Sequence, residues 1–241
     1  ALRAHRIYDI KRPPKLKKKN RLVVNGARQH PSTYTDTTCP VATLLEVRVM
    51  SLIITNRIYR SGTGDSKNAY LHAGARDYLI IIIPEGFPGA GEYAILRKAL
   101  YGLKQGARRY YDLVYSTLLK LGLKQCPLCP CLFRYTVINP TTTKLEACFM
   151  LVYSDDNMFG GEDYAFTKLQ EMLKTKFAIT FEECADFLGT DLHHDVEAGT
   201  FEISMKTFTK KFLEACGITT PFPHPILTPA LTNMKISRSD D

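Results

Sequence analysis

Apolar residues in this chain come in two patterns, short unbroken runs and stripes that recur every three or four positions. The runs predict β-strands, because a strand buried on both faces is apolar at successive positions. We expect strands at residues 20–25, 78–83, 147–160, 186–193 and 200–205. The stretch 147–160 is long enough for a hairpin.

The stripes predict helices with one apolar face each. The first opens at Pro40, the second covers about residues 107–121 and ends before Gly122, and the third follows the hairpin. The residues expected to be buried are, in chain order, Leu44, Leu45, Val49, Leu52 and Ile53; Tyr111, Val114, Leu118 and Leu121; and Phe166, Leu169, Leu173 and Phe177.

A fourth helix is expected near the C-terminus. Thr207 is its N-cap candidate, Phe208 and Phe212 are its buried residues, and Gly217 marks its end. From Thr219 onward the chain holds prolines and shows no periodicity, so an extended tail is predicted. Strands and helices alternate irregularly, which favours an α+β fold over a doubly wound sheet.

Positive charge is concentrated at the N-terminus. The chain has 241 residues and a net charge of +8, and its first 30 residues hold ten Lys and Arg against one acid, Asp9. This basic arm indicates a polyanionic partner, most often nucleic acid. Because so many cations cannot be buried without acids, we expect residues 1–20 at the surface or against such a partner. A solvated tail or a nuclear-import patch around Lys17 is the alternative.

The cysteines and the longest apolar runs indicate in which cellular compartment the protein is expected. Seven cysteines, an odd number in a chain without a secretory h-region, favour reduced thiols. No run is long enough to span a membrane. The cluster Cys126, Cys129 and Cys131 resembles the start of a zinc knuckle, but it has no second ligand pair at a suitable spacing unless distant His193 and His194 contribute. We therefore expect no zinc.

Two adjacent acids, Asp155 and Asp156, follow the apolar run of the predicted hairpin. Like charges so close together repel, and a bound divalent cation is the usual compensation. A third acid, Asp65, ends another short strand-like stretch. Three carboxylates delivered by two strand ends are what two-metal phosphoryl or nucleotidyl transfer needs. An Asp-Asp pair that only caps a polar turn is the alternative.

Eight short motifs occur in the order and spacing of one known family. They are KNRLVVNG at 19–26, CPV at 39–41, DSKNAYL at 65–71, PEGF at 84–87, LYGLKQ at 100–105, PCLF at 130–133, YSDD at 153–156 and FLGTDL at 187–192. With them the chain resembles, from about Lys17 to Pro229, the reverse transcriptase of copia-type (Pseudoviridae) retrotransposons. PEGF and LYGLKQ are identical to that family's motifs.

The resemblance implies a right-hand polymerase fold with fingers, an antiparallel palm sheet and a truncated or absent thumb. The implied parts are a basic N-terminal arm (1–20), fingers (21–60 and 77–99), a palm segment with the first acid (61–76), a palm segment with the catalytic hairpin and primer grip (100–193), and the start of a thumb or connection with an extended tail (194–241).

The resemblance also implies an RNA-directed DNA polymerase core that adds dNTPs to a DNA or RNA primer on an RNA template. Asp65, Asp155 and Asp156 would be catalytic and would hold two Mg²⁺ ions, with Mn²⁺ as a substitute. The other implied sites are nucleotide-binding Lys19, Arg21, Tyr70 and Gln105, of which Tyr70 would exclude a ribose 2′-hydroxyl; the primer grip at Phe187, Leu188 and Gly189; and nucleic-acid contacts at Lys15, Lys17 and Lys18.

Three departures from the family pattern, Ser66, Ser154 and Asn157, place polar residues at apolar positions, and we expect them to soften the palm strands. Protease, integrase and RNase H signatures are not recognised. The competing hypothesis is therefore a domesticated, catalytically inactive module that acts as a structural or RNA-binding subunit among the other proteins of a ribonucleoprotein assembly. In both cases the expected location is intracellular, in the cytoplasm, the nucleus or an organelle matrix, and not in a membrane.

Overall fold

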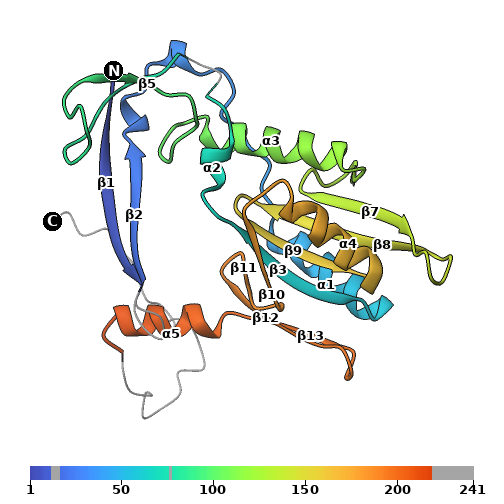
Figure 1. The fold of residues 1–241 in the computed structure, drawn as a ribbon. Helices are drawn as coiled ribbons and strands as arrows, with labels where there is room; N and C mark the ends of the chain where they lie inside the picture. The colour runs from blue at the N-terminus through green and yellow to red at the C-terminus, as the bar shows by residue number, and fades with distance from the viewer. Residues whose placement is uncertain (12–16, 76–77, 219–241) are drawn as a thin grey trace. The chain divides into compact units, whose positions relative to one another are not determined.

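The structure is a computed structural model that describes residues 1–11, 17–75 and 78–218. The chain divides into two units, Ala1–Ser204 and Met205–Asp241, and each is described by itself. Figure 1 shows the order of helices and strands along the chain.

The centre of the first unit is a six-stranded sheet, called here the central sheet, with strand order β10-β3-β9-β8-β7-β6. Its neighbouring strands all run antiparallel. The strands are β3 (Arg60–Ser66), β6 (Lys124–Gln125), β7 (Leu132–Ile138), β8 (Leu145–Tyr153), β9 (Asp156–Gly161) and β10 (Ile179–Glu182). The sheet and the helices around it confirm the α+β class, and β8 and β9 confirm the predicted hairpin.

On one face of the central sheet lies α3 (Gly106–Lys120), which confirms the helix predicted at 107–121. Val114 and Leu118 are buried as predicted. The aromatic residue that joins them in the core is Tyr110, and the expectation that Tyr111 does so was wrong. Positions 110, 114 and 118 are four apart and stay on one side of the helix, whereas Tyr111 points to its flank.

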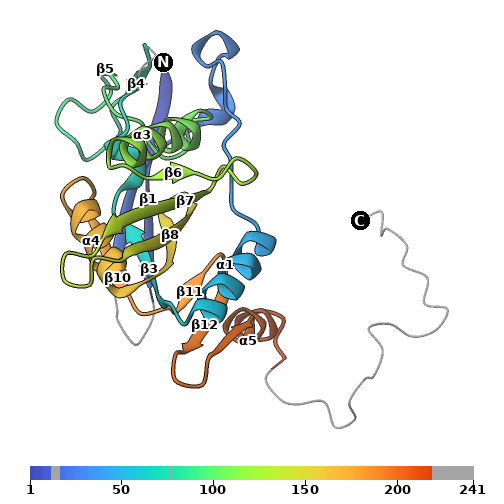
Figure 2. The ribbon, with the colours of Figure 1, turned by 90° about the vertical axis from the view of Figure 1, so that its right-hand side faces the viewer.

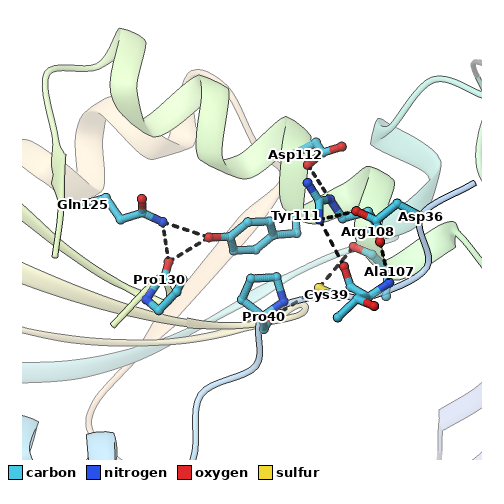
Figure 3. Close-up of polar contacts among 10 residues, drawn as sticks. Asp36, Cys39, Pro40, Ala107, Arg108, Tyr111, Asp112, Gln125 and Pro130 are labelled. Atoms are coloured by element: carbon cyan, nitrogen blue, oxygen red, sulfur yellow. Dashed lines mark hydrogen bonds and ion pairs between the residues drawn. The ribbon is translucent and has the colours of Figure 1, made fainter. Parts of the chain in front are cut away.

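The flank of α3 is tied to two other segments (Figure 3). Arg108 donates to Asp36 at 2.7 Å, in the segment that leads into the first helix, and to Asp112 on its own helix at 2.8 Å. The hydroxyl of Tyr111 donates to the carbonyl oxygen of Pro130 at 2.8 Å. These contacts fix α3 against the chain on both sides of it.

The same face of the sheet carries α4 (Asp163–Lys174), and its burial matches the predicted stripe. Phe166, Leu169 and Leu173 are buried, and Phe177 is buried just after the helix ends. Figure 2 shows α4 and α1 on opposite sides of the sheet strands β7 and β8.

The opposite face of the central sheet is covered by α1 (Leu44–Arg57). The predicted buried stripe of this helix was wrong, since Leu45 and Leu52 are 68% and 67% exposed. The helix also begins at Leu44 and not at Pro40, with Thr43 as its N-cap. Its buried residues are Val47, Met50, Ser51 and Ile54. Because α1 carries apolar residues on most of its circumference, periodicity does not single out the face that is buried.

A glycine of β9 explains which side of α1 faces the sheet. A Cβ atom on Gly160 would lie 2.7 Å from Cδ1 of Ile54 and 3.2 Å from Cε of Met50. Only glycine leaves this space free, so Ile54 and Met50 can lie directly against the backbone of β9.

A four-stranded sheet, called here the N-terminal sheet, has the order β2-β1-β4-β5. Its strands are β1 (Leu2–Lys11), β2 (Lys17–Val24), β4 (Ile80–Ile82) and β5 (Tyr93–Ile95). Strand β1 was not predicted, because the many cations of residues 1–20 indicated an arm. Leu2 is buried in a small core with Ile81, while Ile7 and Tyr8 are 43% and 68% exposed, so most of the described part of this segment lies at the surface as expected.

The loop predicted at 84–89 connects β4 to β5, and Arg6 of β1 holds it. The guanidinium of Arg6 lies 4.1 Å from the centroid of the Phe87 ring and donates to the carbonyl oxygen of Gly86 at 2.7 Å. The loop is thereby fixed to the N-terminal sheet.

The third sheet of the first unit has the order β11-β12-β13 and packs beside α1. Its strands are β11 (Asp186–Phe187), β12 (Thr190–Asp195) and β13 (Thr200–Ser204). They confirm the strands predicted at 186–193 and 200–205, with a tight turn that divides the first of them.

The second unit contains α5 (Lys206–Ala215), which confirms the fourth predicted helix but corrects its details. The N-cap is Met205 and not Thr207. Phe208 and Phe212 are 54% and 58% exposed and stack on each other at 6.3 Å, so the prediction that they are buried was wrong. The stretch 219–241, with the predicted tail, lies outside the described residues. In the described ranges no helix is long and apolar enough to cross a membrane.

Candidate functional site

The register of the central sheet brings the three predicted acids together. Asp65 of β3 stands directly opposite Asp156 of β9. Directly opposed residues of antiparallel strands share a face, so both carboxylates leave the sheet on the same side. Asp155 precedes Asp156 in the turn between β8 and β9, and its carbonyl oxygen accepts a hydrogen bond of 2.8 Å from the backbone N–H of Ser66.

The turn that carries Asp155 is tight. Ser154 has a φ of +53°, in the left-handed region, which brings the two strands of the hairpin close enough for Tyr153 to pair with Asp156. Asn157 is 3% exposed, and its side-chain amide donates to the carbonyl oxygens of Asp155 at 3.4 Å and Gly64 at 3.5 Å. The amide thus joins the turn to β3 next to Asp65.

The three polar departures from the family pattern therefore have hydrogen-bond partners in the structure. Ser66 is buried and bonds to the hydroxyl of Tyr110, and Ser154 lies 3.3 Å from the hydroxyl of Tyr70. Together with the amide of Asn157, they place polar contacts around the acids where the family pattern has apolar side chains.

A metal ion was expected at the three acids. Carboxylates are the ligands that Mg²⁺ prefers, and the backbone positions of Asp65, Asp155 and Asp156 adjoin one another. Their side chains as they stand do not close around one point: among residues 1–11, 17–75 and 78–218, no three His, Cys, Asp or Glu side chains are grouped so as to hold a metal ion. The carboxylate oxygens are suitable ligands for the predicted Mg²⁺ ions. The three side chains, as they stand, are not arranged as a metal site.

A hollow of about 500 Å³ opens beside Asp65 and Asp156. Sequence reasoning missed three charged residues of its wall, Lys67, Glu182 and Asp186. Lys67 stands inside the DSKNAYL motif and Asp186 directly precedes FLGTDL, so their places next to motifs were the available signal. Glu182 has no such signal, because only the pairing of β10 with β3 brings it there.

Tyr70 lies next to the turn of the acids. It belongs to the short helix α2 (Ala69–His72). Its ring meets Tyr101 edge-on at 4.8 Å and Tyr110 at 6.0 Å, and its hydroxyl lies 3.3 Å from Oγ of Ser154. The half-buried ring is therefore fixed between the sheet turn and the loop before α3.

Arg21 approaches the same place from the N-terminal sheet. Its guanidinium lies 5.9 Å above the ring centroid of Tyr101. Burial raises the pKa of Tyr101 above its usual value, and the Asp155 carboxylate raises it further, while Arg21 acts in the opposite direction. Acids, Tyr70, Tyr101 and Arg21 thus form one neighbourhood, in which Tyr101 was not predicted although it lies inside the LYGLKQ motif.

Gln105 has a different environment from the one expected of a nucleotide contact. Its side chain is 3% exposed, and its Oε1 accepts a hydrogen bond of 2.8 Å from Gln29. Its Nε2 donates to the carbonyl oxygen of Thr33 at 3.3 Å, and Oε1 of Gln29 accepts from the backbone N–H of Lys104 at 3.2 Å. The two glutamines join the loop before α3 to residues 29–33.

The residues predicted as a primer grip form the turn between β11 and β12. Phe187 is 1% exposed and packs edge-on against Tyr153 at 6.4 Å, so its side chain anchors the turn in the core. Leu188 and Gly189 have φ values of +52° and +73°, and a Cβ on Gly189 would meet no atom within 4 Å. The part of this segment that faces open space is therefore the backbone of the turn.

The predicted lysine contacts lie in or before β2. Lys18 is exposed and pairs with Ile10 of β1. Lys17 and Lys19 are placed only by their backbone, and Lys15 lies outside the described residues. The basic segment thus continues into β2, the strand that contains Arg21.

The cysteine cluster is part of the packing around the turn before β7. Cys126 and Cys129 are half-buried and Cys131 is buried, with burial raising the pKa of Cys131 to about 12.

Comparisons with known proteins identify the family of the chain. A family model described as reverse transcriptase (RNA-dependent DNA polymerase) matches residues 4–231. The Retrovirus-related Pol polyprotein from transposon RE2 of Arabidopsis thaliana is 29% identical over an alignment of 229 positions that covers 91% of this chain and 15% of that protein. The corresponding polyprotein from transposon TNT 1-94 of Nicotiana tabacum is 25% identical over 228 residues, 91% of this chain and 16% of that protein.

A yeast relative extends the comparison. The truncated transposon Ty1-A Gag-Pol polyprotein of Saccharomyces cerevisiae is 30% identical over 162 residues, 66% of this chain and 13% of that protein. The chain spans less than a fifth of the length of the curated relatives that it matches. The match over nearly the whole chain confirms the resemblance drawn from the eight motifs: the chain belongs to the reverse transcriptase family, with relatives in the polyproteins of copia-type retrotransposons.

Proposed function

We propose that this chain is an RNA-directed DNA polymerase core that adds deoxynucleotides to a primer. The observation that carries the proposal is the pairing of Asp65 with Asp156 across β3 and β9, with Asp155 in the adjoining turn. This register sets the carboxylates of Asp65 and Asp156, 91 residues apart in the sequence, on one face of the sheet, with Asp155 in the turn beside them. Family membership supports the same reaction.

In this proposal residues 61–76 and 100–193 form the palm, residues 21–60 and 77–99 form the fingers after the basic arm (1–20), and the turn between β11 and β12 is the primer grip. Asp65, Asp155 and Asp156 would hold two Mg²⁺ ions. When bound, the ions would supply a lowered pKa at the primer 3′-hydroxyl and neutralise the charge of the triphosphate and of the leaving pyrophosphate.

The remaining residues bind and orient the substrates. Arg21 and Lys19 of β2 contact the triphosphate, for which a guanidinium offers two parallel donors. The ring of Tyr70 fills the space where a ribose 2′-hydroxyl would lie, and so selects deoxynucleotides. The turn at Leu188 and Gly189, exposed at Gly189, supports the primer end, whose position controls the rate.

Gln105 has a supporting role in this proposal. A contact with the nucleotide would require its amide to leave Gln29 and Thr33, where it is buried. Its bonds instead hold the loop that carries Tyr101. Lys15, Lys17 and Lys18 extend the contact along the nucleic-acid backbone, a contribution that weakens as the salt concentration rises.

The test is primer extension by the purified chain on an RNA template, over a series of Mg²⁺ and Mn²⁺ concentrations. Asp155→Asn and Asp65→Asn should abolish incorporation. Asp163→Asn, which changes an exposed acid in the first turn of α4, is the matched control and should extend the primer normally. Tyr70→Ala should raise incorporation of rNTPs relative to dNTPs.

Two outcomes would count against the proposal. If the unchanged chain incorporates nothing with either metal, the inactive structural or RNA-binding module is the better account. If Asp155→Asn retains incorporation, the reaction does not depend on the acids of the hairpin.

A further inference from the structure

Tyr101 touches two of the residues to which the proposed function assigns nucleotide binding. Its ring receives the edge of the Tyr70 ring, with centroids 4.8 Å apart and an angle of 87° between the planes. The guanidinium of Arg21 lies 5.9 Å from the centroid of the same ring. Tyr70 belongs to the chain segment that follows Asp65, and Arg21 to the N-terminal sheet. Tyr101 is therefore the side chain at which these two parts of the neighbourhood meet.

The backbone of Tyr101 is fixed from below by β2. Its carbonyl oxygen accepts a hydrogen bond of 2.8 Å from the N–H of Val24, and the residue forms a β-bridge with Val23. The loop and the strand touch backbone to backbone, because a Cβ on Gly26 would overlap the carbonyl oxygen of Gly102. Gly102 itself has a φ of +88°, which a side chain would strain. The position of Tyr101 thus follows from that of β2.

The glutamine pair holds the other end of this loop. Gln29, which is buried, accepts from the N–H of Lys104 and donates to the buried side chain of Gln105. The backbone of the loop from Tyr101 to Gln105 is consequently anchored at both ends.

Tyr70 packs against the ring of Tyr101. Two aromatic rings and the hydroxyl of Ser154 surround it. Tyr110 lies in the core, where it cannot limit how far Tyr70 moves outward. Tyr101 is half-buried, and its ring lies 5.9 Å from the guanidinium of Arg21, the residue assigned to the triphosphate.

We propose that Tyr101 is a positioning residue for sugar selection, whose ring holds Tyr70 in the orientation that excludes a 2′-hydroxyl. This inference rests on the proposed function, in which Tyr70 selects the sugar. The ring acts by packing, since the phenol stays neutral at working pH. An aromatic replacement should therefore preserve the effect and an aliphatic one should remove it.

The test compares four forms of the full chain: unchanged, Tyr101→Phe, Tyr101→Leu and Tyr111→Leu. Tyr111 is the matched control. It is also a half-buried tyrosine and lies in α3, the helix that follows the loop of Tyr101, but it contacts Gln125 and Pro130 (Figure 3). The readout is the ratio of the dissociation constants of ATP and dATP, measured by competition against a fluorescent dNTP on a primer–template. Incorporation rates of both nucleotides are measured in parallel.

We expect Tyr101→Leu to reduce the preference for dATP by about three- to tenfold, the range that corresponds to loss of one aromatic pair. Tyr101→Phe and Tyr111→Leu should keep the preference of the unchanged chain. In the Tyr70→Ala background, Tyr101→Leu should add nothing, because the proposed effect passes through Tyr70. If Tyr101→Leu does not fold, Tyr101→Met gives the same comparison with a flexible side chain of similar volume.

The outcomes separate this inference from the proposed function. If the unchanged chain extends no primer yet prefers dATP, and Tyr101→Leu removes the preference, the polymerase proposal fails and the role of Tyr101 stands. If the chain extends primers but Tyr101→Leu keeps the full preference, or Tyr101→Phe loses it, the role of Tyr101 is overturned while the polymerase proposal stands. An unchanged chain that binds ATP and dATP equally overturns the role of Tyr101. The role of Tyr101 is also overturned if Tyr101→Leu reduces the dATP preference equally in the unchanged chain and in the Tyr70→Ala background.

Discussion

The two faces of the central sheet are covered by helices of opposite character. On one face α4 is amphipathic, and the residues that its sequence marks as apolar are those that it buries. On the other face α1 is apolar on most sides and buries Met50 and Ile54, while it leaves Leu45 and Leu52 at the surface. The orientation of α4 is a property of its own sequence, whereas that of α1 depends on the strand beneath it.

The N-termini of the two helices show the opposite contrast: α1 is capped by its own residues, and α4 is capped by a residue of the sheet. The first turn of α1 is capped locally, by a box in which Thr43 and Glu46 satisfy each other's backbone groups. The first turn of α4 is capped from a distant strand, since the carboxylate of Glu146 accepts from the N–H groups of Tyr164 and Ala165 at 3.0 and 3.2 Å. In α1 the cap is local and the buried face is determined by the sheet, whereas in α4 the buried face is local and the cap comes from the sheet. Substitutions can test these local and long-range contributions separately.

The largest effect is expected from the glycine under α1. Gly160→Val would place its side chain where Ile54 and Met50 lie, and we expect it to lower the free energy of unfolding by about 3 kcal/mol. Urea denaturation followed by circular dichroism measures this. Gly74→Val is the control, because a Cβ there meets no atom within 4 Å, and its effect should be small. Equal losses for both variants would show that β9 does not orient α1.

The second largest effect is expected on the buried side of α1, and it is compared with a substitution on the exposed side. Ile54→Ala removes a fully buried side chain and should cost about 2–3 kcal/mol, in the lower part of the range for such truncations. Leu52→Ala, two positions away and 67% exposed, should change the free energy of unfolding by no more than about 0.5 kcal/mol. A larger loss for Leu52→Ala than for Ile54→Ala would mean that the stripe expected from the sequence is the one that packs.

A smaller effect is expected from the remote cap of α4. Glu146→Ala leaves two N–H groups of the first turn without their carboxylate, at a cost of about 1.5 kcal/mol. Glu171→Ala on the exposed side of the same helix removes an ion pair with Lys168 and should cost about 0.5 kcal/mol or less. If the two losses measured by urea denaturation are the same, Glu146 does not cap α4.

The smallest effect belongs to the local cap of α1. Thr43→Ala should cost about 1 kcal/mol at pH 7. The hydrogen bond from Thr43 is the main cause that lowers the pKa of Glu46 below its usual value. A carboxyl group whose folded-state pKa is lowered stabilises the fold above its unfolded pKa, and this part is lost as the pH falls through the folded value. Stability curves of both forms between pH 7 and pH 3 should converge, and parallel curves would contradict the role of the carboxylate.

Local sequence patterns were sufficient for part of the fold. The hairpin of β8 and β9 and the burial of Phe166 and Leu169 in α4 follow from apolar patterns within short segments. They could be predicted because each depends on residues that are apolar in an unambiguous pattern. That Asp65 lies near Asp155 and Asp156 was expected from the family resemblance, since their strands are far apart in the sequence.

The features that were missed depend on contacts between distant residues. Gln105 is buried because Gln29, 76 residues earlier, bonds to its amide, and the face of α1 is chosen by Gly160. Neither contact can be recognised in the local pattern of apolar and polar residues. Strand β1 was missed because its cations indicated an arm, while its pairing with β2 and β4 is visible only in three dimensions.

The pairing of β3 with β9 also limits when the site can form during synthesis. Gly64 and Asn157 touch although 93 residues separate them, and β10, which borders β3 on its other side, comes later still. A ribosome-bound chain that ends before β9 therefore carries Asp65 on an unpaired strand. Closing so long a loop costs entropy before any contact rewards it, so this region should fold slowly and late. The acids meet only after most of the first unit has left the ribosome.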